Sequence, residues 1–222
     1  MYPEKPKVGV RATRPNELWH IDVTIIKLLD GTKTYLHAII DNFSRRILAW
    51  RLEERLSPTT TCEPLREAGK NLDATPTVVV DSGVENVNRD VDQLVTDGLL
   101  ERILAQVDVS FSNSMIEAFW RSLRHQWLYL NCLDSLEALR RLISFYVTEH
   151  NKMMPHSAFA GQTPDEVYFK TGERVADKLM AARSEARRAR MEANRKASCR
   201  VCEPVADQST SVINTVAVAN TS

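Results

Sequence analysis

The sequence has few of the features that mark several common protein classes. Its 222 residues include only four cysteines, at irregular spacing, which argues against a disulfide framework. No apolar run approaches the roughly 18 residues of a membrane helix, and the polar first residues contain no apolar block of the signal-peptide kind. We therefore expect a protein that has no membrane partner and works in the cytoplasm.

Two of the cysteines, Cys199 and Cys202, form a single C-x-x-C pair near the end of the chain. A zinc knuckle needs a second pair of ligands, and no His or Cys follows this pair. A solvated tail is therefore favoured over a zinc site.

The chain also lacks a net charge, because 29 Lys and Arg balance 29 Asp and Glu. The charges are nevertheless uneven: residues 1–14 and 183–200 are basic, so the middle is correspondingly acidic. This distribution suits a protein that binds a polyanion while it gathers carboxylates elsewhere. On charge alone, a solvated basic helix at 183–200 is an equal alternative.

Period-two alternation predicts three strands early in the chain, at about 18–29, 34–41 and 46–53. An Asp30-Gly31 pair and the short Asp41–Ser44 connection mark turns, so the three strands are expected to be antiparallel.

Strands and helices alternate further along the chain. "TPTVVVDSG" and "RILAQV" predict two more strands, and helices are expected at about 62–71, at 87–98 and from 114 nearly to 197. Pro64 fits only the first turn of its helix. Asp134 with Glu137, and Thr163 with Glu166, predict helix starts of the capping-box type.

This order of elements predicts an α/β fold, a mixed sheet with helices on both faces. We divide the chain into an N-terminal arm, a core, a basic helical extension and a flexible tail, at residues 1–14, 15–170, 171–200 and 201–222.

Acidic residues stand where strands are expected. Asp22 interrupts the alternating run "WHIDVTIIK", and Asp81 directly follows the apolar "VVV". A carboxylate inside a sheet is costly unless it is paired or binds a metal. If these two hold a metal, a third acid should lie nearby, and Glu117 is the best candidate.

Glu117 begins a charged stripe on a helix that is otherwise apolar on one side. Arg121 and Arg124 follow it at i+4 and i+7. Taken alone, the stripe is more simply explained as an ion-pair ladder on a helix face. The spacing changes this balance, because 35 residues lie between Asp81 and Glu117.

With that spacing, the sequence resembles the D,D-35-E catalytic core shared by retroviral-type integrases and many bacterial insertion-sequence transposases. The resemblance covers about residues 14–170. The pieces that carry it stand in the family's order: "ELWHIDVT", "TYLHAIIDNFSRRILAWRL", "VVVDSGVEN", "SFSNSMIEAFWRSLRHQWL" and "YVTEHNKMMPHSAFAGQTPDEVYF".

The resemblance implies a ribonuclease H-like, five-stranded mixed sheet flanked by helices, followed by a C-terminal helical extension. It also implies phosphoryl transfer on DNA ends, with Asp22, Asp81 and Glu117 as catalytic residues and ligands of two Mg²⁺ or Mn²⁺ ions. Arg121 and Arg124, where many relatives have Lys, would contact DNA phosphates. The implied partners are DNA, further copies of the chain on DNA ends, and a separate DNA-binding domain or protein.

Residues near the first acid have weaker signals. His20 and Thr24 flank Asp22 on the same strand face, where they would support it or simply be polar strand residues. Asp41 is better explained as a turn residue. His150 and Asn151 match a family segment that packs beside the core.

Two alternatives stay open. One is a ribonuclease H-like nuclease that only hydrolyses, against which the segment 146–169 favours a transposase. The other is an inactive DNA-binding remnant, because nothing before residue 14 forms the domain that usually selects DNA ends. Zero net charge also argues against tight DNA binding by this chain alone.

Overall fold

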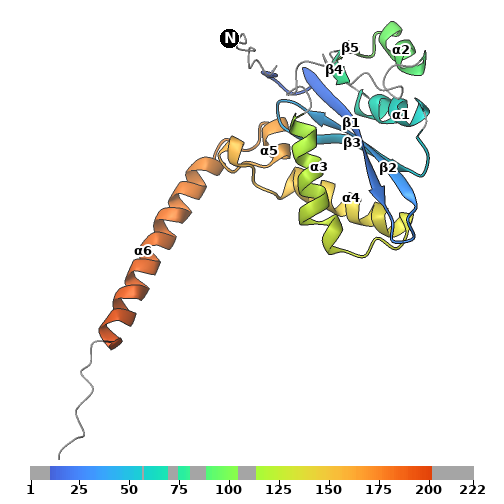
Figure 1. Ribbon diagram of the computed structural model, residues 1–222. Coiled ribbons are helices and arrows are strands. Elements are labelled where there is room, and N and C mark those ends of the chain that lie inside the picture. Colours follow the sequence, from blue (N-terminus) through green and yellow to red (C-terminus); the bar gives the residue numbers. More distant parts are fainter. Residues whose placement is uncertain (1–10, 57, 70–74, 81–88, 105–113, 202–222) are drawn as a thin grey trace, which may run out of the picture. The chain divides into compact units, whose positions relative to one another are not determined.

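A five-stranded mixed sheet lies at the centre of the fold (Figure 1) in the computed structural model, which describes residues 11–56, 58–69, 75–80, 89–104 and 114–201. The strands are β1 (Leu18–Lys27), β2 (Lys33–Asp41), β3 (Ile47–Glu53), β4 (Thr77–Val80) and β5 (Glu101–Leu104). Their order is β3-β2-β1-β4-β5. The pairs β3-β2 and β2-β1 are antiparallel, whereas β1-β4 and β4-β5 are parallel. The predicted mixed five-stranded sheet is confirmed.

Both predicted turns of the meander are present. At the first, Gly31 has a φ of +87°, and the Asp30 carboxylate accepts a hydrogen bond from the Thr32 amide at 2.8 Å. At the second, the fully buried Asp41 accepts hydrogen bonds from the Ser44 amide at 2.8 Å and the Ser44 hydroxyl at 2.6 Å. Burial raises the pKa of Asp41, and these bonds oppose that shift. Asp41 is thus a turn residue, as expected.

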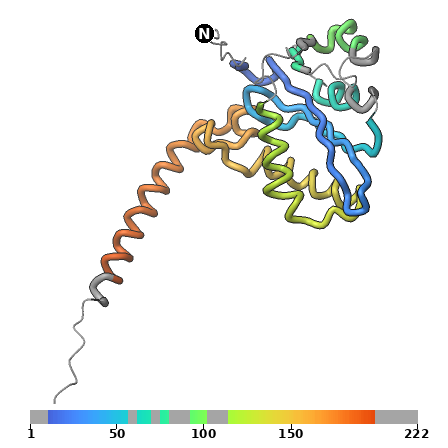
Figure 2. The backbone as a smooth tube through the Cα atoms, in the orientation of Figure 1, coloured from blue at the N-terminus to red at the C-terminus, as the bar shows by residue number. Residues whose placement is uncertain are grey.

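Helices cover both faces of the sheet. The helices of the described chain are α1 (Pro58–Gly69), α2 (Arg89–Thr96), α3 (Ser114–Gln126), α4 (Leu136–Lys152), α5 (Pro164–Tyr168) and α6 (Val175–Val201), with 3-10 turns η1 (Leu128–Leu130) and η2 (Ser157–Phe159). In the tube view, α3 and α4 lie on one side of the long β1–β2 hairpin, and α1 lies on the other (Figure 2).

The alternation of the strands divides the buried side chains into two cores. On one face, Ile26 and Ile40 pack with Leu123 of α3 and Ile143 of α4. The opposite face has its own cluster of strand and helix residues, composed of Trp19, Ile21, Ile39, Ala49, Cys62, Leu65, Val78, Leu94 and Leu100. Each central strand is therefore buried on both sides, which holds its polar residues in a rigid frame.

Two local helix predictions were wrong. Pro64 lies inside α1 and not in its first turn, and it is buried beside Cys62 and Leu65. Burial of this apolar segment against the sheet offsets the lost backbone hydrogen bond. The start of α4 is Ser135, whose hydroxyl accepts from the Ala138 amide at 3.2 Å, so the cap is one residue later than Asp134.

The predicted capping box at Thr163 is confirmed. The Glu166 amide donates to the Thr163 hydroxyl at 3.2 Å, and the Thr163 amide donates to the Glu166 carboxylate at 2.8 Å. Pro164 occupies the first turn, where its missing N–H costs no helix hydrogen bond.

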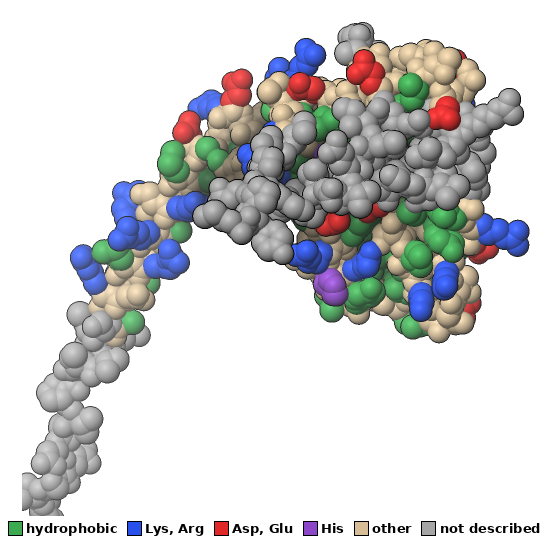
Figure 3. All heavy atoms as spheres, turned by 45° about the horizontal axis from the view of Figure 1, so that its top comes forward, with side chains coloured by type: hydrophobic (Ala, Val, Ile, Leu, Met, Phe, Trp, Pro, Cys, Tyr) green, Lys and Arg blue, Asp and Glu red, His purple; other side chains and the backbone are tan. Residues whose placement is uncertain are grey.

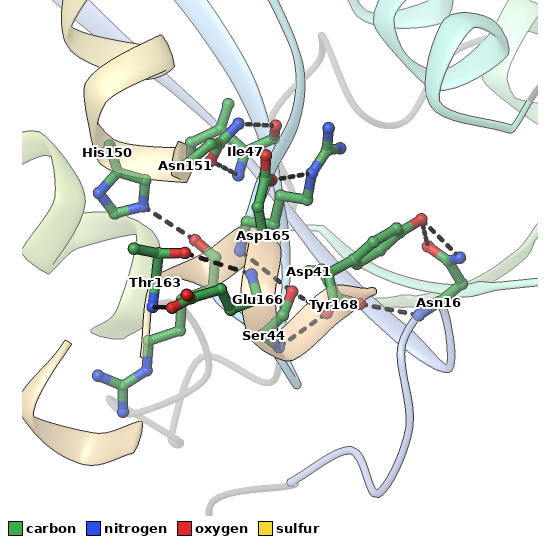
Figure 4. A network of polar contacts seen from close by, with 12 residues as sticks. Asn16, Asp41, Ser44, Ile47, His150, Asn151, Thr163, Asp165, Glu166 and Tyr168 are labelled. Carbon is green, nitrogen blue, oxygen red and sulfur yellow. Dashed lines mark hydrogen bonds and ion pairs between the residues drawn. The ribbon is translucent and has the colours of Figure 1, made fainter. Parts of the chain in front are cut away.

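Polar side chains of α4 and α5 hold the β2–β3 turn and the start of β3 (Figure 4). Asn151 donates to the Ile47 carbonyl and accepts from the Ile47 amide, both at 2.9 Å. Asp165 of α5 pairs with Arg46 at 2.6 Å. The Tyr168 hydroxyl reaches Asn16 before β1. The segment from α4 to α5 thus joins the start of β1 to the β2–β3 turn.

The chain divides into two compact units, Met1–Ala176 and Asp177–Ser222. In the second unit, the described side chains of α6 are exposed, apart from the half-buried Leu179. None of the described helices is both long enough and apolar enough to cross a membrane.

Asn151→Ala should destabilise the protein, because it leaves the buried amide and carbonyl of Ile47 without partners. We expect a loss of about 1–3 kcal/mol in the free energy of unfolding. Urea denaturation should show a lower midpoint with an unchanged slope. The control is Asn131→Ala, which removes an exposed bond to the Trp127 carbonyl and should cost less than about 0.5 kcal/mol. Equal losses in both variants would contradict this role of Asn151.

His37 should make stability depend on pH. It is 1% exposed on β2, and burial lowers its pKa to about 4. Its Nε2 has no hydrogen-bond partner among the described residues. In the unfolded chain His37 binds a proton near pH 6.5, whereas in the folded protein it does so only near pH 4. Its contribution to the free energy of unfolding is therefore complete above pH 6.5, and it falls by about 3 kcal/mol as the pH drops towards 4.

The comparison of wild type with His37→Leu isolates this contribution from those of the other histidines. Urea unfolding at pH 7 and at pH 4.5 should show a smaller loss of stability for the variant. An identical pH dependence in the two proteins would show that His37 is protonated equally in the folded and unfolded states.

Candidate functional site

Asp22 lies near the middle of β1, opposite Ala38 of β2. Alternation places it on the face that also carries His20, Thr24 and the buried Ile26, which packs against α3 and α4. The Asp22 side chain is half-buried, whereas His20 and Thr24 are buried. A carboxylate is therefore held on a rigid strand below a helix, with part of its surface open to solvent.

Trp120 of α3 contacts this carboxylate. Its indole Nε1 donates a hydrogen bond to Oδ2 of Asp22 at 2.9 Å, and the Trp120 side chain is only 4% exposed. Ile116 and Leu123, both fully buried, hold the same side of α3 against the sheet. The bond fixes the orientation of one carboxylate oxygen of Asp22.

Arg124 makes a second contact between α3 and β1. Its Nη2 donates to the Thr24 hydroxyl, and its Nε is buried without a hydrogen-bond partner among the described residues. The guanidinium is therefore half-buried against the strand. Arg121, by contrast, is exposed. Both arginines were expected to contact DNA phosphates, and in this structure only Arg121 is free of burial.

Glu117 lies about one turn before Trp120 on α3, and its side chain is exposed. A helix rises about 1.5 Å per residue, and a strand rises about 3.3 Å. From Trp120 to Arg124 α3 therefore advances about 6 Å, and β1 advances about 6.6 Å between their partners Asp22 and Thr24. The two contacts therefore show that α3 and β1 run in the same direction and almost in step, with Glu117 on the helical turn before Trp120.

Asp81, the second expected acid, lies outside the described residues. The described part of β4 ends at Val80, the residue before it in the sequence. In the parallel pairing of β1 and β4, Val79 lies opposite His20. The described strand thus ends one residue beyond the position opposite His20, and His20 is two residues before Asp22 on β1.

The donor chemistry fits a hard divalent cation. Asp22 and Glu117 offer carboxylate oxygens, which are the ligands that Mg²⁺ prefers. In the described part of the chain, no three His, Cys, Asp or Glu residues come together as a metal site. With two carboxylates described, the site needs a third acid or a substrate oxygen.

Sequence reasoning missed the role of Trp120. Its spacing with Ile116 and Leu123 is typical of the core-facing side of a helix, and that explanation is correct for most of its surface. The Nε1–H is the signal that could have found it, because a buried indole usually needs an acceptor. His20, on the same strand face as Asp22, pairs with Asn42, whose Nδ2 is 2.8 Å from the His20 Nε2.

Known proteins match this chain over the same region. Two family models, each described as integrase core domain, match residues 12–114 and 101–164. The putative transposase InsK of insertion sequence element IS150 from Escherichia coli K12 is 26% identical over 158 residues, which are 70% of this chain and 56% of InsK. The transposase InsF of IS3A from the same organism is 24% identical, over 70% of this chain and 54% of InsF.

Solved structures share the fold. The HTLV-2 integrase catalytic core domain in complex with magnesium, in its dimeric form, has a TM-score of 0.58 and 19% identity, over 71% of this chain and 99% of that one. A simian T-cell lymphotropic virus intasome, in complex with PP2A regulatory subunit B56 gamma, has a TM-score of 0.62 and 17% identity, over 72% and 57%. These likenesses confirm the ribonuclease H-like fold.

The chain spans little more than half the length of the curated relatives it matches. The two family models overlap and together span residues 12–164, the region that contains β1 to β5, α3 and α4. The chain therefore belongs to the integrase core domain family, and over this region it is similar to transposases of bacterial insertion sequences.

Proposed function

We propose that this chain is the catalytic core of a metal-dependent DNA transposase, which cuts and joins DNA ends by phosphoryl transfer. The observation that carries the proposal is the half-buried Asp22 on β1, which accepts a hydrogen bond from Trp120 of α3, the helix that also carries the exposed Glu117 one turn earlier. A half-buried carboxylate in a sheet is costly unless it is paired, and a bound cation would stabilise it.

Asp81 completes the proposed ligand set. Its support is the pairing of β1 with β4 and its place in the sequence directly after Val80. Together, Asp22, Asp81 and Glu117 would hold two Mg²⁺ or Mn²⁺ ions through their carboxylate oxygens. The magnesium in the HTLV-2 integrase core supports this choice of metal.

When bound, the two ions would activate the attacking oxygen and stabilise the leaving oxygen of the phosphodiester. The residues of the chain would orient the metal ligands and position the DNA. Trp120 holds one oxygen of Asp22, so the carboxylate does not rotate when substrate arrives. Arg121, exposed one turn after Glu117, would contact a DNA phosphate. Arg124 would contact DNA only if its guanidinium left Thr24, so we propose that it mainly aligns α3 with β1.

The proposed partners are DNA and further copies of this chain on the two DNA ends. The dimeric form of the HTLV-2 core and the simian virus intasome support an assembly of this kind. A separate DNA-binding domain or protein remains part of the proposal, and so does the cytoplasmic location, where a bacterial DNA substrate lies.

Substitution of any one proposed ligand should abolish activity. We expect Asp22→Asn, Asp81→Asn and Glu117→Gln each to lower nicking of labelled DNA in Mn²⁺ by about 10²-fold or more. Loss of a metal ligand removes several kcal/mol of transition-state stabilisation, and each ~1.4 kcal/mol is tenfold in rate. The control is Glu137→Gln, which removes an exposed acid paired with Arg141 and should retain activity.

The products distinguish the competing functions. Joined DNA strands in the wild-type reaction indicate a transposase, whereas nicked products without joining indicate a hydrolytic nuclease. A folded, metal-loaded wild type with no activity, even when a DNA-binding partner is supplied, would indicate an inactive remnant.

Trp120→Phe should weaken metal binding without unfolding the protein. The substitution keeps an aromatic ring in the core but removes the donor to Asp22, and the loss of such a supporting bond typically costs about 10–100-fold in metal affinity. Electron paramagnetic resonance of unbound Mn²⁺ measures the affinity directly, without DNA.

Trp127→Phe is the matched control. Its Nε1 donates to the Leu142 carbonyl at 3.0 Å, so this variant also loses an indole hydrogen bond, but not one to a proposed ligand. Equal Mn²⁺ affinity in the Trp120→Phe and Trp127→Phe variants would show that the indole does not support Asp22.

A further inference from the structure

Helix α6 carries a row of arginines along one face. Arg183, Arg187 and Arg190 stand at i, i+4 and i+7, and positions at this spacing share one side of a helix. All three side chains are exposed. Figure 3 shows Lys and Arg side chains along the described part of this helix.

Two of the three acids of α6 are turned away from this arginine row, and the third, Asp177, lies six residues before Arg183. Glu185 and Glu192 each follow a member of the row by two residues, which is about 200° round the helix. No Asp or Glu stands three or four residues from Arg183, Arg187 or Arg190, so none of the three has an acid at helical ion-pair spacing.

The other cations of the helix are different. Arg188 lies three residues after Glu185 and four before Glu192, and Arg195 lies three after Glu192. Lys196 forms an ion pair with Glu192 at 2.8 Å. Glu185 and Glu192 therefore lie beside these three cations, and the arginine row keeps its charge.

An arginine row of this kind opposes helix formation, because like charges at i+3 and i+4 repel each other. The helix is also exposed almost all round, with only Leu179 half-buried among the side chains described from Asp177 on. A partner that covers α6 through a broad apolar surface is therefore disfavoured, and a polyanion fits the uncompensated charge.

We propose that the arginine row is a contact surface for the phosphate backbone of DNA. This inference rests on the proposed function, because the DNA substrate comes from it. The row covers about 10.5 Å of helix, a length over which one DNA strand presents about three phosphates along its axis. It would position DNA without reading sequence, since phosphate contacts carry no base information.

The test compares two triple variants of the full chain that lose the same charge. One replaces the row by Arg183→Gln, Arg187→Gln and Arg190→Gln. The other replaces the acid-flanked cations by Arg188→Gln, Arg195→Gln and Lys196→Gln. Binding of a labelled duplex of arbitrary sequence is measured by fluorescence anisotropy in EDTA over a range of salt concentrations, with helix content checked by circular dichroism.

Each lost phosphate contact should reduce the slope of log K against log salt by about 0.9. We therefore expect the row variant to lose about 2–3 from the slope and the matched variant less than about 1. Equal changes in the two variants would overturn the proposal, because binding would then follow net charge alone. No change in either would overturn it too, because α6 would not contact DNA.

The result is separable from that of the proposed function. Binding in EDTA needs no catalysis, so Asp22→Asn should keep the wild-type slope even though it cannot cut. If the enzyme is active but the salt slope of its DNA binding is the same with and without the arginine row, only the arginine contact is disproved. A row-dependent salt slope in a protein with no nicking activity would disprove only the catalytic proposal.

Discussion

The packing of α3 along β1 is the constraint on which the site depends. Fully buried side chains, Ile116 and Leu123, hold the helix against the sheet. Hydrogen bonds from Trp120 to Asp22 and from Arg124 to Thr24 set its position along the strand. A shift of α3 by one residue would move Glu117 by about 1.5 Å along the helix and turn it by about 100°. The packing of the apolar core therefore also determines where the carboxylates lie.

The rest of the first unit protects this alignment. The other face of the sheet is covered by its own apolar core, so β1 cannot bend away from α3. The end of α4 and helix α5 hold the β2–β3 turn through Asn151 and Asp165, and Tyr168 of α5 reaches Asn16. These polar contacts join parts of the chain that are far apart in sequence. The contact with Asn16 holds β1, the strand that carries Asp22, at its start, and the two apolar cores hold it along its faces.

Much of this arrangement follows from local patterns in the sequence. Period-two alternation located β1 and the face of Asp22, and the Thr163 capping box was found from residue spacing alone. The contacts of Trp120 and Arg124 could not be predicted, because they depend on how far α3 lies along β1, which no local pattern encodes. Pro64 was misplaced for a related reason: tertiary burial overrides the local preference of proline for the first turn.

The central claim is that Asp22, Asp81 and Glu117 form one metal site supported by the Trp120 indole. The most direct measurement is a Mg²⁺ titration followed by the indole N–H resonances in NMR, for wild type and Asp81→Asn. A shared site predicts that the indole N–H resonance of Trp120 shifts with bound Mg²⁺, while that of Trp127 does not. It also predicts that Asp81→Asn needs at least about tenfold more Mg²⁺ for the same shift. A shared site would be contradicted if the Trp120 resonance did not shift with Mg²⁺, or if it shifted at the same Mg²⁺ concentration in wild type and in Asp81→Asn.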